Sequence, residues 1–304
     1  MRILITGANG LLGQKLADML QAYVGGSVLC MSKSSNRNPS LKQANFLSFD
    51  LTDFSRFMEG AQAFQPTHII HTAAITSVEA CEQEPEQCER INVLLSEQIA
   101  QYCKENNIHL TFLSTDFVFD GTAGPYAEGD ATNPCNRYGK SKLDAERRIL
   151  QTGCRTAILR TILVYGVIAD RKRSNIVLWV KNALTKGENI SVVSDQWRMP
   201  TWVDDLSRAC ILASEREAEG IFHISGNELF SILEIAQQVA SFWKLDTSLI
   251  SPVTARDIGQ EFNRPKKTGF SIKKAQDLLG YRPTPFLDSL KEIEQQLATI
   301  KYHE

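Results

Sequence analysis

A glycine-rich turn between a strand and a helix, close to the start of the chain, restricts the fold more than any other feature. The apolar run RILIT at residues 2–6 predicts a buried strand, and LLGQKLADMLQAY has the apolar spacing of a helix. The segment TGANGLLG joins the two, and its glycines Gly7, Gly10 and Gly13 permit a tight turn and a close approach of the backbone to another group. A strand that passes directly into a helix in this way typically begins a βαβ unit.

The chain up to about residue 165 repeats this alternation of strands and helices. Further short apolar runs are SVLCMS at 27–32, THIIHTA at 67–73, HLTFLS at 109–114 and TAILRT at 156–161. Helical patterns separate these runs, the longest being EQCERINVLLSEQIAQYCKENN. We therefore predict an α/β fold, a Rossmann-type doubly wound parallel sheet with a smaller C-terminal substrate lobe.

The domain boundary follows from the point at which the alternation loosens. We expect residues 1–165 to form the Rossmann domain, with a later segment near 203–225 returning to it. Residues 166–304 would then form mainly the second lobe. A chain of 304 residues is long enough to bury a core in each part.

Charge and cysteine usage narrow the class of partner. The formal net charge of −2 gives no electrostatic reason to expect binding to nucleic acid, and no apolar run is long enough to span a membrane. The seven cysteines are odd in number and lack CxxC spacing, which argues against a disulfide framework and a zinc site. We attribute the spacing of Cys81 and Cys88 to one packed face. We predict no metal site, and we expect a cytoplasmic protein.

The glycine-rich turn predicts a nucleotide site. Phosphate groups are favoured at the N-terminus of a helix, and glycines let the backbone approach them. The spacing is GxxGxxG, which differs from the commoner GxGxxG, so an ordinary tight turn is the alternative. The residues predicted to bind the cofactor here are Gly7, Asn9, Gly10, Leu11, Leu12 and Gly13.

The end of the second predicted strand indicates which dinucleotide binds. A carboxylate there would bind the ribose hydroxyl of NAD(H), but the segment CMSKSSNR has none and offers Ser32, Lys33 and Arg37 instead. We predict NADP(H), with NAD(H) left open because exposed cations are often only solvated. Further cofactor contacts are predicted at the next strand end and in HTAAITS, from Asp50, Leu51, Thr72, Ala73, Ala74 and Thr76.

Two further segments suggest hydride-transfer chemistry. Tyr138 and Lys142 in YGKSK stand four apart, on one face of a helix, and Ser114 and Thr115 end a predicted strand. A carbonyl that receives a hydride also needs a proton, and a nearby cation favours the ionised form of a tyrosine. We predict Thr115, Tyr138 and Lys142 as catalytic residues, with Ser114, Tyr138 and Lys142 also contacting the cofactor. A chance pair on an exposed helix, and a strand-end cap, are the alternatives.

Nearly the whole chain resembles the extended short-chain dehydrogenases/reductases, and within them the dTDP-4-dehydrorhamnose reductase group. The segments that carry the resemblance are TGANGLLG, HTAAITSVEACE, INV, LSTDFVFDG, YGKSKLDAE, LRTILVYG, DQWRMPT and NRPKKTGFS. The resemblance implies that Thr115, Tyr138 and Lys142 form a catalytic triad. It also implies that NADPH reduces the C4 ketone of a dTDP-linked 6-deoxy-4-keto sugar.

The resemblance is weaker on the sugar side. The group usually has tyrosine at Phe117, tryptophan at Leu163, asparagine at His71 and glycine at Arg198. A different 4-keto nucleotide sugar therefore stays open. The substrate contacts that we predict are Phe117, Leu163, Asn175, Trp197, Arg198 and Arg264, with Arg173 as a further cation for the diphosphate.

Two other functions stay open. The methionine adenosyltransferase regulatory subunit also resembles this group, so the chain could bind NADP(H) without turnover. An epimerase or dehydratase is the other alternative, but dehydratases of this class generally carry Asp-Glu beside the catalytic threonine, whereas Thr115 is followed by Asp116 and Phe117. The sequence leaves the oligomeric state open, a homodimer included.

Overall fold

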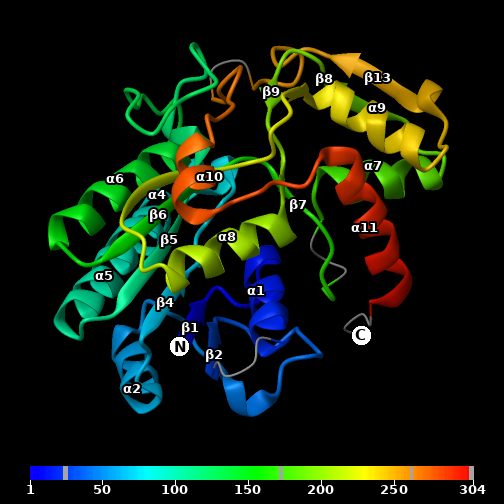
Figure 1. Cartoon of the computed structure of the whole chain (residues 1–304). Helices are drawn as coiled ribbons and strands as arrows, with labels where there is room; N and C mark the ends of the chain where they lie inside the picture. The colour runs from blue at the N-terminus through cyan, green and yellow to red at the C-terminus, as the bar shows by residue number, and fades with distance from the viewer. Residues whose placement is uncertain (23–26, 171–173, 261–262, 301–304) are drawn as a thin grey trace.

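Seven parallel strands form the centre of the structure, a computed structural model that describes residues 1–22, 27–170, 174–260 and 263–300 (Figure 1). Their order across the sheet is β11-β6-β5-β4-β1-β2-β3. The strands are β1 (Arg2–Thr6), β2 (Ser27–Ser32), β3 (Phe46–Ser48), β4 (His68–His71), β5 (His109–Thr115), β6 (Thr156–Thr161) and β11 (Gly220–Ile224). The order reverses between β1 and β4, as in a Rossmann sheet, which confirms the predicted fold class.

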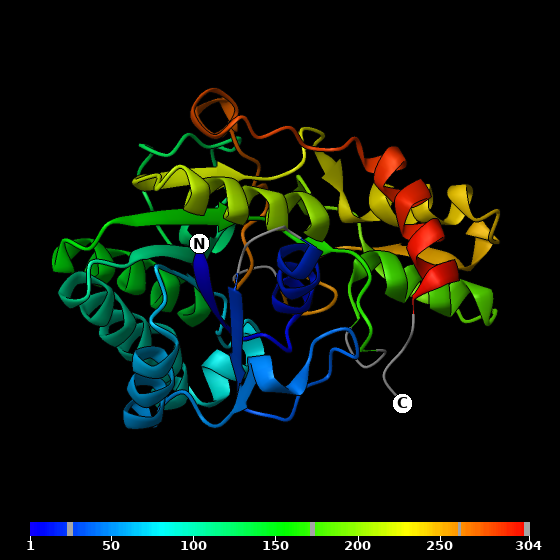
Figure 2. The ribbon, with the colours of Figure 1, turned by 60° about the horizontal axis from the view of Figure 1, so that its bottom comes forward.

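Helices cover both faces of the sheet (Figures 1 and 2). The helices on one face are α1 (Leu11–Ala22), α8 (Val203–Glu215) and α10 (Lys273–Leu279); those on the other are α2 (Phe54–Phe64), α5 (Leu95–Glu105) and α6 (Arg137–Thr152). Ile3 and Ile5 belong to the same apolar cluster as Leu16 of α1, whereas Leu4 clusters with Phe57 of α2. Both faces of these strands are buried, which explains why their sequences are almost continuously apolar.

The longest predicted helix is interrupted. It consists of α4 (Pro85–Glu89), a π-helical turn η2 (Arg90–Leu94) and α5, and it follows the short helix α3 (Val78–Gln83). A π-turn displaces the residues of a helix relative to its regular face and is frequent at functional sites. The turn contains Asn92, whose contacts reach the candidate site.

The second lobe has its own apolar cluster. Its helices are α7 (Ile176–Thr185), α9 (Ile232–Phe242) and α11 (Phe286–Thr299), and its parallel strand pair is β8 (Ile190–Val193) with β13 (Ile250–Val253). Short pairs join β7 (Val164–Tyr165) to β10 (Thr201–Trp202), and β9 (Trp197–Arg198) to β12 (Phe230–Ser231). The chain returns to the large sheet through α8 and β11, which pairs with β6. The division into a cofactor domain and a substrate lobe stays a prediction.

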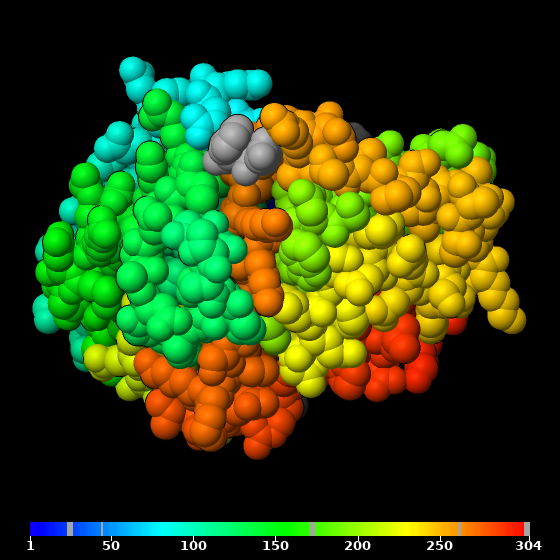
Figure 3. Space-filling model, turned by 90° about the horizontal axis from the view of Figure 1, so that it is seen from above, coloured from blue at the N-terminus to red at the C-terminus, as the bar shows by residue number. Residues whose placement is uncertain are grey.

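One extended segment, residues 264–270 and here called the strap, connects the two parts. The Lys267 amide donates to the carbonyl oxygen of Gly121, and the Thr268 amide donates to that of Trp197. In Figure 3 the strap, in orange, lies between the green segment near residue 125 and the second lobe. Three single-turn elements complete the described chain: η1 (Gln43–Asn45), η3 (Asp116–Val118) and η4 (Thr247–Leu249). Among the described residues, no helix has the length and apolar character needed to cross a membrane.

Candidate active site

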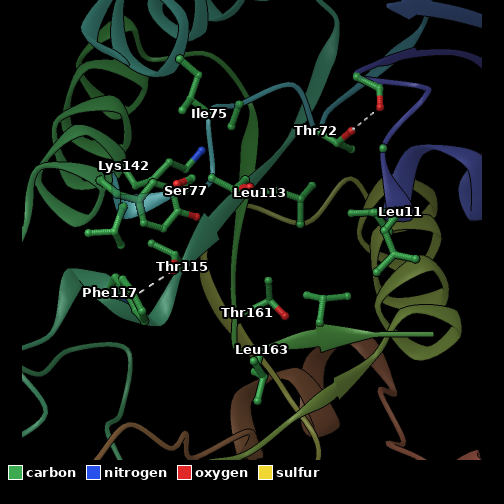
Figure 4. A pocket seen from close by; sticks show the side chains of 18 of the residues that line it. Leu11, Thr72, Ile75, Ser77, Leu113, Thr115, Phe117, Lys142, Thr161 and Leu163 are labelled. Atoms are coloured by element: carbon green, nitrogen blue, oxygen red, sulfur yellow. Dashed lines mark hydrogen bonds between the residues drawn. The ribbon is translucent and has the colours of Figure 1, made fainter. Parts of the chain in front are cut away.

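A cavity of about 900 Å³ extends from the glycine-rich turn, past the carboxyl ends of the strands, into the second lobe. Thr72 after β4, Thr115 at the end of β5 and Thr161 at the end of β6 line it, and Figure 4 shows their side chains around one space. Ile176 and Trp179 of α7 line its far end. The carboxyl ends of the strands, beside the reversal of strand order, are where doubly wound sheets bind ligands.

Nearly all the residues predicted from the sequence to form the site lie on the wall of this cavity. The exceptions among the described residues are Gly13, Arg37, Asn175 and Trp197. Arg173 lies outside the described residues. The fold therefore brings together the predicted catalytic residues, the glycine-rich turn and some of the predicted substrate-contact residues.

The glycines are required by close packing. Gly7 has φ +71°, and a Cβ there would lie 2.7 Å from the backbone nitrogen of Ala73. A Cβ at Gly13 would lie 2.4 Å from the carbonyl oxygen of Gly7, so Gly13 serves the contact between α1 and the turn. Leu11 and Leu12, the first residues of α1, line the cavity. The N-terminus of this helix thus borders the space in which a phosphate group would be favoured.

Asn9 holds the loop that follows β2. Its Nδ2 donates to the carbonyl oxygen of Ser35 at 2.8 Å, and its Oδ1 accepts from the amide of Arg37 at 3.0 Å. The Arg37 guanidinium pairs with Asp170 at 3.1 Å, which explains why it does not line the cavity. Lys33 does line it and is 72% exposed, so its ammonium can reach a ligand.

Asp50 lies opposite Lys33 on the wall of the cavity. The ammonium of Lys33 is 2.9 Å from Asp50 Oδ2. The pKa of Asp50 is lowered to about 2, first by the backbone amide of Thr52 and then by Lys33. The only carboxylate at this end of the predicted dinucleotide site, among the lining residues described, is therefore already paired with a cation.

Thr115 and Tyr138 are brought together by the contact between α6 and the segment after β5. A Cβ at Gly139 would lie 2.1 Å from the carbonyl oxygen of Phe117, so only glycine lets the start of α6 approach this closely. The Thr115 side chain is close enough to Tyr138 to favour the ionised form of the phenol. Lys142 follows one helical turn later and is 3% exposed. Its ammonium lies 4.0 Å from the centroid of the Phe112 ring.

Burial dominates the acid–base properties of both groups. It raises the pKa of Tyr138 to about 12, and Asp116 acts in the same direction, whereas the Thr115 side chain acts in the opposite direction. Burial also lowers the pKa of Lys142 to about 7. Burial therefore sets the direction of the Tyr138 pKa shift in this structure, and the predicted role of Lys142 in favouring the phenolate stays a prediction.

Asn92 is a site residue to which the sequence assigned no role. Its Oδ1 accepts from the amide of Ile75 at 2.8 Å, and its Nδ2 donates to the carbonyl oxygen of Ile75 and to Ser141 Oγ, both at 2.9 Å. Ile75 lines the cavity, and Ser141 lies between Tyr138 and Lys142 on α6. Asn92 thus connects the loop after β4 to α6, which carries the predicted catalytic residues. The motif INV marked the position without indicating these contacts.

The interpretation of Cys81 and Cys88 as one packed helical face is wrong. The two residues form a disulfide with a Cα–Cα distance of 5.2 Å. The helix is interrupted between α3 and α4, where Pro85 begins the second helix, and the two short helices bring the sulfur atoms together. The cytoplasmic location stays a prediction.

Phe117 lies beside Tyr138, the predicted catalytic tyrosine. Its ring makes an edge-to-face contact with that of Tyr138, with centroids 5.9 Å apart, and the Arg198 guanidinium carbon is 5.8 Å from its centre. Leu163 lines the cavity with a left-handed backbone, φ 39°. At both positions an apolar side chain borders the space where the related group would offer tyrosine or tryptophan.

Arg198 is occupied by contacts within the protein. It is 4% exposed and donates to the carbonyl oxygens of Trp197 and Pro265, each at 2.7 Å. It also donates to that of Lys266 at 3.3 Å and lies 3.7 Å from the Asp116 carboxylate. We therefore propose that Arg198 fixes the strap rather than binding the substrate diphosphate.

Arg264, Asn175 and Trp197 differ in what they offer a substrate. Arg264 lines the cavity and pairs with Glu79 at 2.5 Å, and its buried Nε has no hydrogen-bond partner among the described residues. Asn175 instead caps α7, and the backbone of Trp197 pairs with the strap. Of the two predicted diphosphate-binding arginines that the structure describes, Arg264 is therefore better placed than Arg198 to contact a substrate.

The model of a family described as "RmlD substrate binding domain" matches residues 1–299. The chain belongs to the RmlD substrate-binding domain family. It is 32% identical to methionine adenosyltransferase 2 subunit beta of Mus musculus over 298 residues, covering 96% of this chain and 86% of that protein.

Two solved structures of members of the dTDP-4-dehydrorhamnose reductase group are similar to the chain. The enzyme from Clostridium acetobutylicum superposes with a TM-score of 0.86 at 27% identity, over 98% of this chain and 100% of that one. The enzyme from Bacillus anthracis, solved in complex with NADP, has a TM-score of 0.84 at 27% identity, over 98% and 99% of the two chains. These similarities confirm the resemblance that the motifs indicated.

Proposed function

We propose that the chain is an NADPH-dependent reductase of the C4 ketone of a dTDP-linked 6-deoxy-4-keto sugar. The observation that carries this proposal is the position of Thr115, Tyr138 and Lys142 on the wall of one cavity that begins at the glycine-rich turn. The relation to two dTDP-4-dehydrorhamnose reductases, one of them in complex with NADP, supports the same reaction class.

The residues present fit a dinucleotide. The backbone at Gly7 borders the cavity where a side chain would be excluded, and the N-terminus of α1 adjoins it. Lys33 supplies an exposed cation at the end where a 2′-phosphate would lie, and the Asp50 carboxylate is engaged by that lysine. We propose that Gly7, Gly10 and Leu11 hold the pyrophosphate and that Lys33 selects NADP(H) over NAD(H).

The bound cofactor would supply the hydride. Tyr138 would donate its phenolic proton to the ketone oxygen as the alcohol forms, and the Thr115 hydroxyl would hydrogen-bond to the same oxygen. A tyrosine with a pKa raised to about 12 is fully protonated at neutral pH and can act as this donor. Lys142, in its charged form, would stabilise the phenolate that is left.

The residues predicted to contact the sugar support the choice of substrate less strongly than the glycine-rich turn and Lys33 support the choice of cofactor. Phe117 and Leu163 offer apolar contact but no hydrogen bond to a sugar hydroxyl, so another nucleotide-linked 4-keto sugar fits the cavity on the same grounds. Arg264 is our candidate for the diphosphate. The test is to measure NADPH oxidation with dTDP-4-keto-6-deoxy sugars and with the corresponding UDP and GDP sugars. A preference for the UDP or GDP sugars would change the substrate and leave the reaction class intact.

The similarity to methionine adenosyltransferase 2 subunit beta, at 32% identity over 96% of the chain, favours a second candidate function. We infer that a non-catalytic regulatory subunit would keep NADP(H) binding without turnover. Capture of a stoichiometric partner enzyme, together with no oxidation of NADPH by any keto sugar, would favour this candidate.

A further inference from the structure

A buried ion pair joins α6 to the neighbouring strand β6. Glu146 and Arg160 are each 2% exposed. Arg160 Nη2 donates to Glu146 Oε2 at 2.7 Å, and Arg160 Nε donates to Oε1 at 3.0 Å. The hydroxyl of Ser114, which lines the cavity, also donates to Oε1. Every carboxylate oxygen of Glu146 is therefore engaged, and the contacts come from the ends of both β5 and β6.

The position of Glu146 on α6 connects this ion pair to the catalytic lysine. Glu146 follows Lys142 by four residues, so the two side chains share one face of the helix. Lys142 has no hydrogen-bond acceptor among the contacts described; its ammonium rests on the Phe112 ring. A buried ammonium in such a place needs an opposite charge to stay ionised.

We propose that Glu146 is a positioning residue for Lys142: its carboxylate, fixed by Ser114 and Arg160, keeps the Lys142 ammonium charged beside Tyr138. The inference rests on the proposed function for the role of Lys142 in catalysis, but the electrostatic claim can be tested without any substrate. The same three contacts hold α6 against the ends of β5 and β6, where Thr115 and Thr161 line the cavity.

The electrostatic surroundings of Lys142 give the direction of the effect. Burial lowers the pKa of Lys142, and Glu146 is the group that raises it again. The titratable and charged groups that face this corner are Tyr138 and Glu146 on α6, His71 at the end of β4, Asp116 after β5 and Arg160 on β6. Burial lowers the pKa of His71 to about 3, so this imidazole is neutral near pH 7 and adds no competing charge there.

The test is a pH titration of Lys142 in the protein without added ligands. Lysines labelled with carbon-13 at Cε report their own protonation by NMR, and the Lys142 signal is identified by its loss in Lys142→Arg. In Glu146→Gln, which keeps the shape and removes the charge, we expect the Lys142 midpoint to fall by about one to two pH units. An unchanged midpoint would overturn the proposal.

Asp144 provides a matched control on the same helix. It lies two residues from Lys142, is 53% exposed in its side chain and pairs with Arg147 at 3.6 Å. Asp144→Asn removes one negative charge that water screens, so we expect the Lys142 midpoint to stay within about 0.3 pH units. Equal shifts in Asp144→Asn and Glu146→Gln would mean that the effect is only the net charge of the helix.

Glu146→Gln leaves the Arg160 charge buried and could prevent folding. The double variant Glu146→Gln with Arg160→Gln removes both charges while keeping two amides that can hydrogen-bond. We expect its Lys142 midpoint to remain below that of the wild type, by less than in the single variant. A midpoint equal to or above that of the wild type would contradict the proposal.

A kinetic readout then links the electrostatic effect to catalysis. If Lys142 must be charged, the rate should decline as pH rises through the Lys142 pKa, and Glu146→Gln should move this decline of kcat/KM to lower pH. If no keto sugar is reduced, the proposed function fails while the titration still decides the role of Glu146. A shifted midpoint with an unshifted kinetic profile would refute the catalytic part alone.

Discussion

At the scale of single residues, the proposed reduction depends on Tyr138 as a proton donor that burial keeps protonated. The Thr115 side chain acts on its phenol, and its ring contacts Phe117 in an edge-to-face arrangement. Neither contact involves the glycine-rich turn. The chemistry of the ketone and the binding of the dinucleotide should therefore respond separately to substitution.

Tyr138→Phe tests this separation. The variant keeps the ring and loses the proton donor, so we expect kcat to fall by about 10²- to 10⁴-fold while the Kd for NADPH changes by less than about threefold. Steady-state kinetics and fluorescence titration of NADPH measure the two quantities. Unchanged turnover would remove Tyr138 from the mechanism.

Lys142 makes a prediction about stability. Below about pH 7 the lysine is protonated in both the folded and the unfolded chain, so the folded chain bears the whole free-energy cost of burying the charge. Between about pH 7 and pH 10 the unfolded chain binds more protons than the folded chain, so folding gains stability as pH rises. Relative to Lys142→Met, the wild type should therefore gain about 3 kcal/mol in free energy of unfolding over this range. Urea unfolding at several pH values measures it, and a constant difference would contradict it.

The proposed contact between Lys33 and the 2′-phosphate predicts how a substitution of Lys33 changes cofactor preference. Removing an exposed cation from a 2′-phosphate costs about 1 kcal/mol, so Lys33→Gln should weaken NADPH binding by about five- to tenfold and leave NADH binding nearly unchanged. Lys186→Gln is a matched control, because Lys186 pairs with Glu188 and does not line the cavity. Tighter binding of NADH than of NADPH by the wild type would refute the assignment.

At the scale of elements, the strap depends on one buried arginine. Arg198 donates to three carbonyl oxygens and lies beside the Asp116 carboxylate. This carboxylate also accepts hydrogen bonds from the hydroxyls of Thr115 and of Thr268 in the strap. Removing the guanidinium would leave the buried carboxylate without a cationic partner and the Pro265 carbonyl oxygen without its arginine donor.

Arg198→Met should lower the free energy of unfolding by about 3 to 5 kcal/mol. It should also speed hydrogen exchange at the amides of Lys267 and Thr268, which bond the strap to its neighbours. Arg148→Met is the control, because Arg148 forms an exposed pair with Glu97 and should cost less than about 1 kcal/mol. Strap amides that exchange as slowly as in the wild type would show that Arg198 does not hold the segment.

Sequence patterns predicted elements well where the physics is local. Continuous apolar runs, separated by helical patterns, located β1, β2, β5 and β6, because parallel strands that are buried on both faces are apolar on both faces. The pattern could not show that the helix after residue 85 contains a π-turn, or that Cys81 and Cys88 meet across the break between α3 and α4. These features depend on contacts between helices, and the spacing of apolar residues along one helix gives no information about such contacts.

The candidate site was predictable only in part for the same reason. Residues at strand ends and in the glycine-rich turn converge because the sheet places them together. Asn92, Glu146 and the buried role of Arg198 arise from pairs far apart in sequence, such as Arg198 with Pro265. In the sequence alone, an arginine in a polar segment is indistinguishable from a solvated charge.

At the scale of the whole molecule, one cavity joins the carboxyl edge of the sheet to the second lobe. The glycine-rich turn and Lys33 border one end, Thr115 and Tyr138 the middle, and Arg264 and Trp179 the lobe side. In the proposed function, these three regions would hold the dinucleotide, the reacting ketone and the diphosphate of the substrate, in that order along the cavity. We therefore expect a hydride to pass within this cavity from NADPH to the sugar.

The most direct measurement of that transfer follows the hydride itself. The protein is incubated with NADPH deuterated at the transferable position of the nicotinamide and with a dTDP-4-keto-6-deoxy sugar, and the product is examined by mass spectrometry and NMR. We expect a 4-hydroxy sugar with one deuterium at C4, and no such product from Tyr138→Phe. Tight binding of NADPH with no deuterium in the sugar would contradict the proposed reduction and favour the regulatory function.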